Sequence, residues 1–313
     1  MRGKALLALV VATLLGVSAA HAASVSETPL RADHLVGLYF RPDDATAPLP
    51  GMIMLGGSEG GLSPIVTAEA RALAAQGYAV LQLGYFGLSG LSETLQLIPV
   101  EYFEHAVSWL ASQQGVEAQH IGIMGTSIGG EAALLVASHD PRITAVIAAV
   151  PSAIVWRGIG AWGQRDPASS FTLGGEPLPA LPHVFSQTDS VFDGYAQGLA
   201  ALPDHPAARV AVLAINGPVM LVCGARDDVW PSCPMARDAA EMLKRGGFTH
   251  RLVLLAYPEA GHAVFGPPVA PSDPFYADLG ALGGTAAAND AARADAWPRA
   301  LAFLHAAFST AAH

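Results

Sequence analysis

The sequence is poor in charge, above all in positive charge. Charged residues make up only 13% of the 313 residues, against an apolar fraction of 52%. This balance excludes an intrinsically disordered chain and predicts a globular protein with a large core. The length suits one large domain or two small ones.

Basic residues are too few for a nucleic-acid partner. Sixteen Lys and Arg stand against 26 Asp and Glu, for a formal net charge of −10. Because phosphate binding requires a basic face, this deficit argues against DNA or RNA binding. The metalloprotease pattern H-E-x-x-H and paired cysteine motifs are also missing, so we expect no metal and no cofactor. No feature indicates the oligomeric state.

Long apolar runs are missing outside the N-terminus. There, Arg2 and Lys4 precede the apolar stretch 5–17, and Ala20-His21-Ala22 follows as a small-x-small site. This arrangement predicts a signal peptide over 1–22, cleaved before a domain over 23–313, in a periplasmic or secreted protein. An uncleaved anchor is the alternative. Since no later segment is a convincing span, we expect no stable membrane insertion after cleavage.

The chain has only two cysteines, Cys223 and Cys233. The first lies on a predicted strand and the second just beyond the loop that follows it. In an oxidising compartment they could form a disulfide. The alternative is a pair of buried thiols.

Short apolar runs alternate with helical patterns along the chain. Strands are expected at 35–40, 52–55, 79–83, 121–124, 143–150, 219–223 and 251–256, and helices at 66–75, 100–112, 130–138 and 292–308. Near-continuous apolar strands separated by helices are typical of a parallel sheet covered on both faces. The sequence therefore predicts an α/β fold, with a mostly parallel central sheet flanked by helices.

One stretch breaks the alternation. Residues 152–216, called the insertion below, are rich in Pro, Gly and polar residues and show no clear strand. A connection of this length is usually functional or forms a small subdomain. We expect it to form a cap over the active site and to govern substrate choice. The alternative is a poorly ordered surface excursion.

Gly125-Thr126-Ser127-Ile128-Gly129 matches the pattern G-x-S-x-G. The pattern is common by chance, but here it follows an apolar strand and opens a predicted helix. This strand–turn–helix context is the nucleophile elbow of serine hydrolases, in which glycines permit the tight turn. Ser127 is thus the predicted nucleophile at the carboxyl edge of the sheet.

A serine nucleophile needs a base and a carboxylate that orients the base. In this fold the acid and then the histidine follow the nucleophile in the chain. Asp227 and Asp228 both come just after the strand at 219–223, and His262 follows the last strand. We predict Asp227 and His262 as partners of Ser127, because hydrolases that this chain resembles usually carry the acid three residues after the glycine that ends this strand. Other histidines, such as His139 and His205, lie at less suitable places.

An oxyanion hole needs two backbone N–H groups near the nucleophile. One is expected from Ile128, directly after the serine. The second is expected from the glycine-rich loop 56–61, with Ser58 as the first candidate and Glu59 as the alternative. The spacing of these glycines does not fit the dinucleotide-binding motif G-x-G-x-x-G.

At these residues the chain resembles the C-terminal domain of acyl-CoA thioester hydrolases and bile acid-CoA:amino acid N-acyltransferases. The resemblance covers 56–62, 77–87, 98–110, 121–137, 216–232, 257–268 and 288–303, in the same order. It implies an α/β-hydrolase fold, related to dienelactone hydrolases, with Ser127, Asp227 and His262 as the triad. It also implies activity on acyl thioesters, typically of CoA.

Three departures from that family bear on the substrate. Only a short stretch separates the predicted signal from the first strands, so we expect no N-terminal β-sandwich domain. Ile128 stands where the family often has lysine, which removes a cation. Export also places the protein where CoA is scarce. The predicted function is cleavage of a small-molecule acyl thioester through an acyl-enzyme. A carboxylesterase or dienelactone-type lactone hydrolase is the alternative, and a non-catalytic binding module is a second.

Overall fold

The computed structural model describes residues 24–161, 164, 166–183 and 190–309. The predicted signal peptide and its cleavage site lie outside these residues. Among the residues described, no helix is both long and apolar enough to cross a bilayer.

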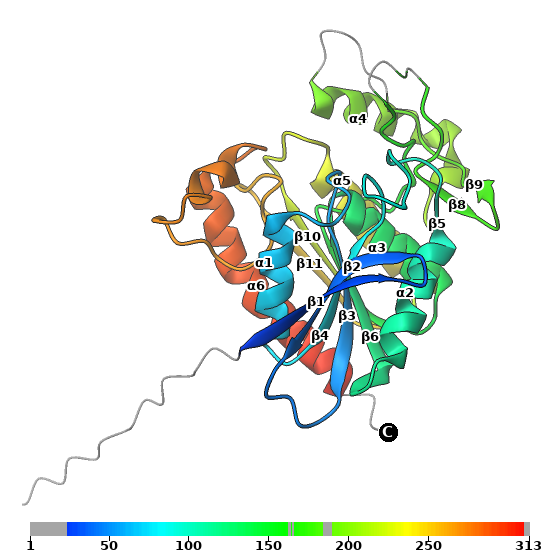
Figure 1. Ribbon diagram of the computed structural model, residues 1–313. Helices are drawn as coiled ribbons and strands as arrows, with labels where there is room; N and C mark the ends of the chain where they lie inside the picture. The colour runs from blue at the N-terminus through cyan, green and yellow to red at the C-terminus, as the bar shows by residue number, and fades with distance from the viewer. Residues whose placement is uncertain (1–23, 162–163, 165, 184–189, 310–313) are drawn as a thin grey trace, which may run out of the picture.

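An eight-stranded sheet forms the centre of the protein (Figure 1), with the strand order β1-β2-β4-β3-β6-β7-β10-β11. β1 pairs antiparallel with β2, and β2 with β4, whereas every later pairing in the sheet is parallel. The strands are β1 (Val25–Ala32), β2 (Leu35–Pro42), β3 (Leu49–Leu55), β4 (Ala79–Gly84), β6 (Val116–Thr126), β7 (Ile143–Ala149), β10 (Val219–Gly224) and β11 (Leu252–Tyr257). The predicted mostly parallel sheet is therefore confirmed.

Helices cover both faces of the sheet and create two apolar cores. One core joins the sheet to α2, α3, α5 and the insertion, and the other joins it to α1 and α6. Figure 1 shows α1 and α6 together on one side, away from α2 and α3. The helices are α1 (Pro64–Ala74), α2 (Val100–Ser112), α3 (Ile128–His139), α4 (Val191–Ala200), α5 (Ser232–Arg245) and α6 (Ala286–Ser309).

The insertion contains more regular structure than its sequence indicates. Strands β8 (Phe171–Leu173) and β9 (Glu176–Pro177) form a small second sheet with β5 (Ile98–Pro99). Helix α4 and the 3₁₀ turns η1 (Leu202–Asp204), η2 (Pro206–Ala208) and η3 (Val212–Ala214) follow. The expectation of no clear strand is wrong for β8 and β9, whose two or three residues are too few to show an alternating pattern.

The topology brings distant segments to one edge of the sheet. Because β6, β10 and β11 run in parallel, the residues that follow Thr126, Gly224 and Tyr257 all lie at the carboxyl edge. Ligands bind at this edge in open α/β sheets. The three predicted triad residues each follow one of these strands.

Candidate active site

Ser127 occupies the turn between β6 and α3 in a conformation that few residues adopt. Its φ is 61° and its ψ is −125°. A non-glycine residue in this region is strained, and such strain is found mainly at functional sites. Its N–H donates to Ala149 O at 2.9 Å, which ties the turn to β7. The backbone therefore has the sharp bend that the nucleophile-elbow pattern predicts.

The two glycines of the motif are needed for space. A Cβ on Gly125 would lie 2.0 Å from Gly129 O, and one on Gly129 would lie 2.2 Å from Gly56 O. These contacts are far shorter than van der Waals distances, so larger residues would force the strand, helix and loop apart. Close packing of α3 beneath Ser127 depends on both positions.

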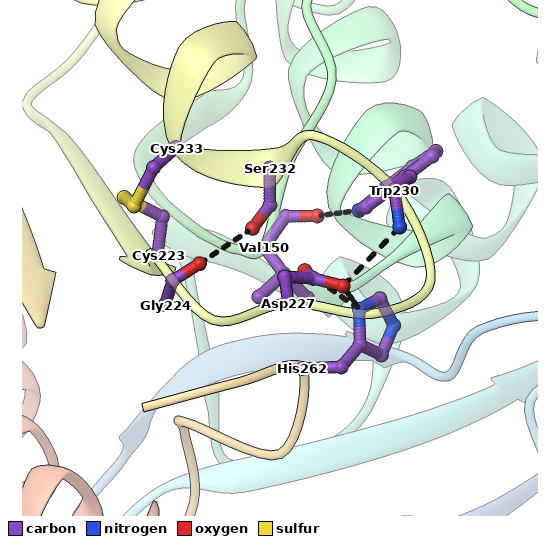
Figure 2. Close-up of a disulfide and its surroundings, with 8 residues drawn as sticks. All are labelled: Val150, Cys223, Gly224, Asp227, Trp230, Ser232, Cys233 and His262. Atoms are coloured by element: carbon purple, nitrogen blue, oxygen red, sulfur yellow. Dashed lines mark hydrogen bonds and ion pairs between the residues drawn. A yellow bond between two sulfur atoms is a disulfide. The ribbon is translucent and has the colours of Figure 1, made fainter. Parts of the chain in front are cut away.

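Asp227 and His262 meet at the carboxyl edge of the sheet (Figure 2). His262 Nδ1 lies 2.9 Å from Asp227 Oδ2 and 3.0 Å from Oδ1, and both side chains are buried. The carboxylate also accepts the backbone N–H groups of Val229 at 2.9 Å and Trp230 at 3.2 Å. Asp228, by contrast, is exposed. The structure therefore brings Asp227 to the imidazole and leaves Asp228 in solvent.

Ser127 and His262 line one cavity of about 360 Å³, together with Gly57, Ser58 and Glu59 of the glycine-rich loop. Because Asp227 engages Nδ1, Nε2 is the imidazole nitrogen left for the serine. A serine and an oriented imidazole at one cavity can carry out nucleophilic acyl transfer.

The loop after β3 is fixed closely against the serine. A Cβ on Gly57 would lie 3.2 Å from Ser127 Cβ. The Tyr85 hydroxyl donates to the carbonyl oxygens of Gly56 and Gly57 at 2.7 and 3.0 Å. The Gly57 N–H donates to Glu59 Oε1 at 2.8 Å and is therefore engaged. This leaves the next N–H groups, those of Ser58 and Glu59, as candidates for the oxyanion hole.

Ile128 is the first residue of α3. Its N–H consequently has no acceptor within the helix, and the positive end of the helix dipole lies beneath Ser127. Both features favour negative charge beside Ser127, as a second oxyanion donor would require.

The insertion does not form the wall of this cavity. None of its described residues lines the cavity, whose wall beyond His262 comes instead from the segment 263–282, which includes η4 (Tyr276–Gly280). The insertion reaches the site indirectly, through rings of Trp156, Tyr195 and Trp230 stacked edge to face, the last 6.3 Å from the His262 ring. Control of substrate choice by the insertion stays a prediction.

Sequence reasoning missed Asn289, a fully buried side chain on α6. Its Oδ1 accepts the Gly261 N–H, and its Nδ2 donates to the carbonyl oxygens of Leu279 and Gly283. It thereby holds the loop before His262 against the segment 263–282. Asn289 lies before the helix predicted at 292–308, so no local pattern indicated its role.

Glu131 was also missed. It lies on α3 one turn after Ser127, fully buried, and its Oε1 accepts the Trp156 N–H of the insertion at 3.1 Å. Its Oε2 has no partner among the described residues. Burial raises the pKa of this carboxyl well above its ordinary value. Glu131 therefore links α3, the helix that begins beside Ser127, to the insertion through a carboxyl that resists ionisation.

Glu131→Gln is expected to flatten the dependence of stability on pH. The folded state holds the Glu131 proton more tightly than the unfolded state. The free energy of unfolding therefore falls as pH rises from the ordinary carboxyl pKa towards the raised one. Glutamine keeps an acceptor but cannot ionise. Between pH 5 and pH 8 the free energy of unfolding of the variant should therefore rise relative to that of wild type by about 1 kcal/mol or more. Urea unfolding at these pH values measures it; the exposed Glu93→Gln is the control. Parallel profiles for wild type and Glu131→Gln would contradict the assignment.

The two cysteines form a disulfide, Cys223–Cys233. It joins the end of β10 to the start of α5 and so encloses the loop that carries Asp227 (Figure 2).

Among the described residues no cluster of three or more His, Cys, Asp or Glu could hold a metal ion.

The sequence profile of the family described as "BAAT / Acyl-CoA thioester hydrolase C terminal" matches residues 98–310. The match spans more than half of the chain and includes Ser127, Asp227 and His262. The chain belongs to this family. The resemblance inferred from the motifs is thus confirmed.

Two human relatives of this chain are named acyl-coenzyme A thioesterases. Human acyl-coenzyme A thioesterase 1 is 31% identical over 90% of this chain, and human mitochondrial acyl-coenzyme A thioesterase 2 is 30% identical over 90%. The chain spans only 65% and 57% of the lengths of these two relatives.

Solved structures confirm the α/β-hydrolase fold. A putative dienelactone hydrolase from Klebsiella pneumoniae superposes with a TM-score of 0.56 at 20% identity, covering 91% of this chain and 99% of that one. A puromycin-hydrolyzing peptidase from Mycobacterium tuberculosis gives a TM-score of 0.58 at 16% identity, covering 90% and 39%. At these identities the likeness concerns the fold alone.

Proposed function

We propose that the protein is a serine hydrolase that cleaves acyl thioesters through an acyl-enzyme on Ser127. One observation carries the proposal: the buried His262–Asp227 pair and the strained Ser127 turn open on the same cavity. Membership of a family whose relatives are named acyl-coenzyme A thioesterases supports a thioester as the bond that is cleaved.

In the first half-reaction, His262 Nε2 takes the proton of the Ser127 hydroxyl as Oγ attacks the carbonyl carbon. Asp227 holds the imidazole in the tautomer with hydrogen on Nδ1 and stabilises its charged form. The N–H groups of Ser58 and Ile128 hold the negative oxygen of the tetrahedral intermediate, each contributing about 3–4 kcal/mol. The C–S bond then breaks, and the thiol leaves with the proton from His262.

In the second half-reaction, water attacks the acyl-enzyme carbonyl and gives a proton to His262. Collapse of the second tetrahedral intermediate releases the carboxylic acid and returns the proton to Ser127 Oγ. The net reaction is thioester plus water to carboxylic acid plus thiol. Each proton moves through one imidazole nitrogen, so the chemistry needs no other titrating group.

We further propose that the protein acts outside the cytoplasm. The basic and apolar N-terminal sequence supports this, and so does the Cys223–Cys233 disulfide, because disulfides persist in oxidising compartments. Fractionation of cells that express the full chain tests the proposal. Recovery of the protein with the cytoplasmic fraction, without shortening at its N-terminus, would contradict it.

Labelling and a substrate panel test the function together. A fluorophosphonate probe should modify Ser127, as located by peptide mapping. Acyl-CoA, acyl-N-acetylcysteamine and p-nitrophenyl esters should separate the leaving groups, and turnover should survive a chelator. Ester turnover without thioester turnover would favour a carboxylesterase or lactone hydrolase. The absence of both labelling and turnover would indicate a non-catalytic binding module.

A further inference from the structure

A second cavity adjoins the one that holds Ser127. The first measures about 360 Å³ and the second about 440 Å³. They share four wall residues, namely Ile65, Glu69, Phe275 and Arg293. The second cavity is therefore a continuation of the first between α1 and the segment 263–282.

The walls of the second cavity are largely apolar. α1 supplies Pro64, Ile65, Ala68 and Ala72, and the facing wall supplies Pro267, Pro268, Val269, Ala270 and Phe275. Apolar clefts of a few hundred Å³ are typical of sites for small molecules. A hydrocarbon group would lose its contact with water here without giving up a hydrogen bond.

The one cation among the lining residues is already paired. Arg293 is buried, and its Nη2 lies 3.1 Å from Glu69 Oε1. Its Nε donates to Pro267 O at 2.8 Å, and its Nη1 donates to Phe265 O. The remaining charge on these walls is the exposed carboxylate of Asp273, while Asp278 lines the first cavity. A polyanionic leaving group such as CoA finds no counter-charge here, whereas an alkyl chain needs none.

We propose that the second cavity receives the distal part of the substrate's acyl chain. The inference rests on the function proposed above, and it assigns Ile65, Ala68 and Phe275 as residues that determine chain length. Short acyl groups fit within the first cavity. Longer ones pass Ile65 and Phe275 and lie along α1, so their extra methylenes are buried as the chain lengthens.

Ala68→Trp tests this by filling the second cavity. Ala68 is exposed on α1, so the indole enters the cavity without disturbing the core. For p-nitrophenyl dodecanoate we expect kcat/KM to fall about 100-fold. This corresponds to the exclusion of about three to four methylenes, each of which costs about fourfold. For p-nitrophenyl acetate the value should stay within twofold of wild type. Ala270→Trp, on the facing wall, should act in the same way. Gln76→Trp, beyond the end of α1 and outside both cavities, is the matched control.

Two series of substrates distinguish effects of the acyl chain from effects of the leaving group. In the first, the acyl chain varies and p-nitrophenol is constant; in the second, the acyl group is butanoyl and the leaving group is p-nitrophenol, N-acetylcysteamine or CoA. Dependence of the Ala68→Trp effect on the leaving group would overturn the proposal. So would equal losses on all substrates, or unchanged chain-length profiles in both variants.

Calorimetry with dodecanoate and butanoate distinguishes failure of the cavity assignment from failure of the proposed function. If no ester is turned over but Ala68→Trp and Ala270→Trp selectively weaken dodecanoate binding, the cavity assignment stands and the hydrolase proposal falls. If wild type binds both acids alike, the cavity assignment falls whatever the protein's activity.

Discussion

Replacing Ser127 by alanine is expected to lower kcat by about 10⁴-fold or more, in line with the loss of nucleophiles from other triads. The substitution removes only the side-chain hydroxyl group. The elbow is held by backbone contacts, among them the hydrogen bond from Ser127 N to Ala149 O, so the fold should remain. Alanine must adopt the same positive φ, as serine does. Steady-state hydrolysis of a p-nitrophenyl ester, with circular dichroism as the check on folding, measures the effect.

Ser138→Ala is the matched control, since Ser138 lies near the other end of α3 and its hydroxyl donates to Leu135 O within the same helix. It should retain wild-type kcat. The fluorophosphonate probe should label this control and fail to label Ser127→Ala. Ester turnover by Ser127→Ala within tenfold of wild type would show that another group is the nucleophile.

Asp227→Asn is expected to cause nearly the same loss of kcat, about 10⁴-fold. Asparagine fills the same volume but carries an amide. If the amide oxygen accepts the hydrogen bond from Nδ1, the negative charge that stabilises the imidazolium is absent. To use its nitrogen, asparagine must force the imidazole into the wrong tautomer. The buried carboxylate also accepts the N–H groups of Val229 and Trp230, so the substitution weakens the loop as well.

Asp228→Asn provides the comparison within the same loop. Asp228 is exposed and makes its described contact with Leu282 through its backbone N–H. Losing its charge should change kcat by less than about tenfold, since exposed charges interact weakly through water. Comparable losses of kcat in the two variants would contradict the assignment of Asp227 as the acid.

Much of the sheet could be predicted because its strands are buried on both faces. The runs at 79–83 and 219–223 are continuous and apolar, and they correspond to β4 and β10. β1 was missed because it is an edge strand whose side chains are mostly exposed, which leaves little apolar signal. α5 was missed although Ala236, Ala239 and Leu243 have helical spacing. Its buried face consists largely of small residues, and two prolines stand at its start.

The geometry around the candidate triad could be predicted less fully. Ser127 lies in a motif of contiguous residues, so its turn could be anticipated from the strand before it and the helix after it. Asn289 and Glu131 act through contacts with segments 28 and 25 residues away, and no local pattern encodes those contacts. The walls of the cavity were misjudged for the same reason. Prolines and glycines indicated an excursion at 152–216, but they could not indicate which excursion borders Ser127.

The Cys223–Cys233 bond closes a covalent ring around the segment that carries Asp227, because the two cysteines are ten positions apart in the chain. Closing a ring removes conformations that an open loop would sample, and so favours the arrangement in which the carboxylate meets the imidazole. A freshly synthesised chain, with both thiols still reduced, carries its acid on an open loop. On the hydrolase function and the export proposed above, we expect full catalytic competence only after this bond has formed.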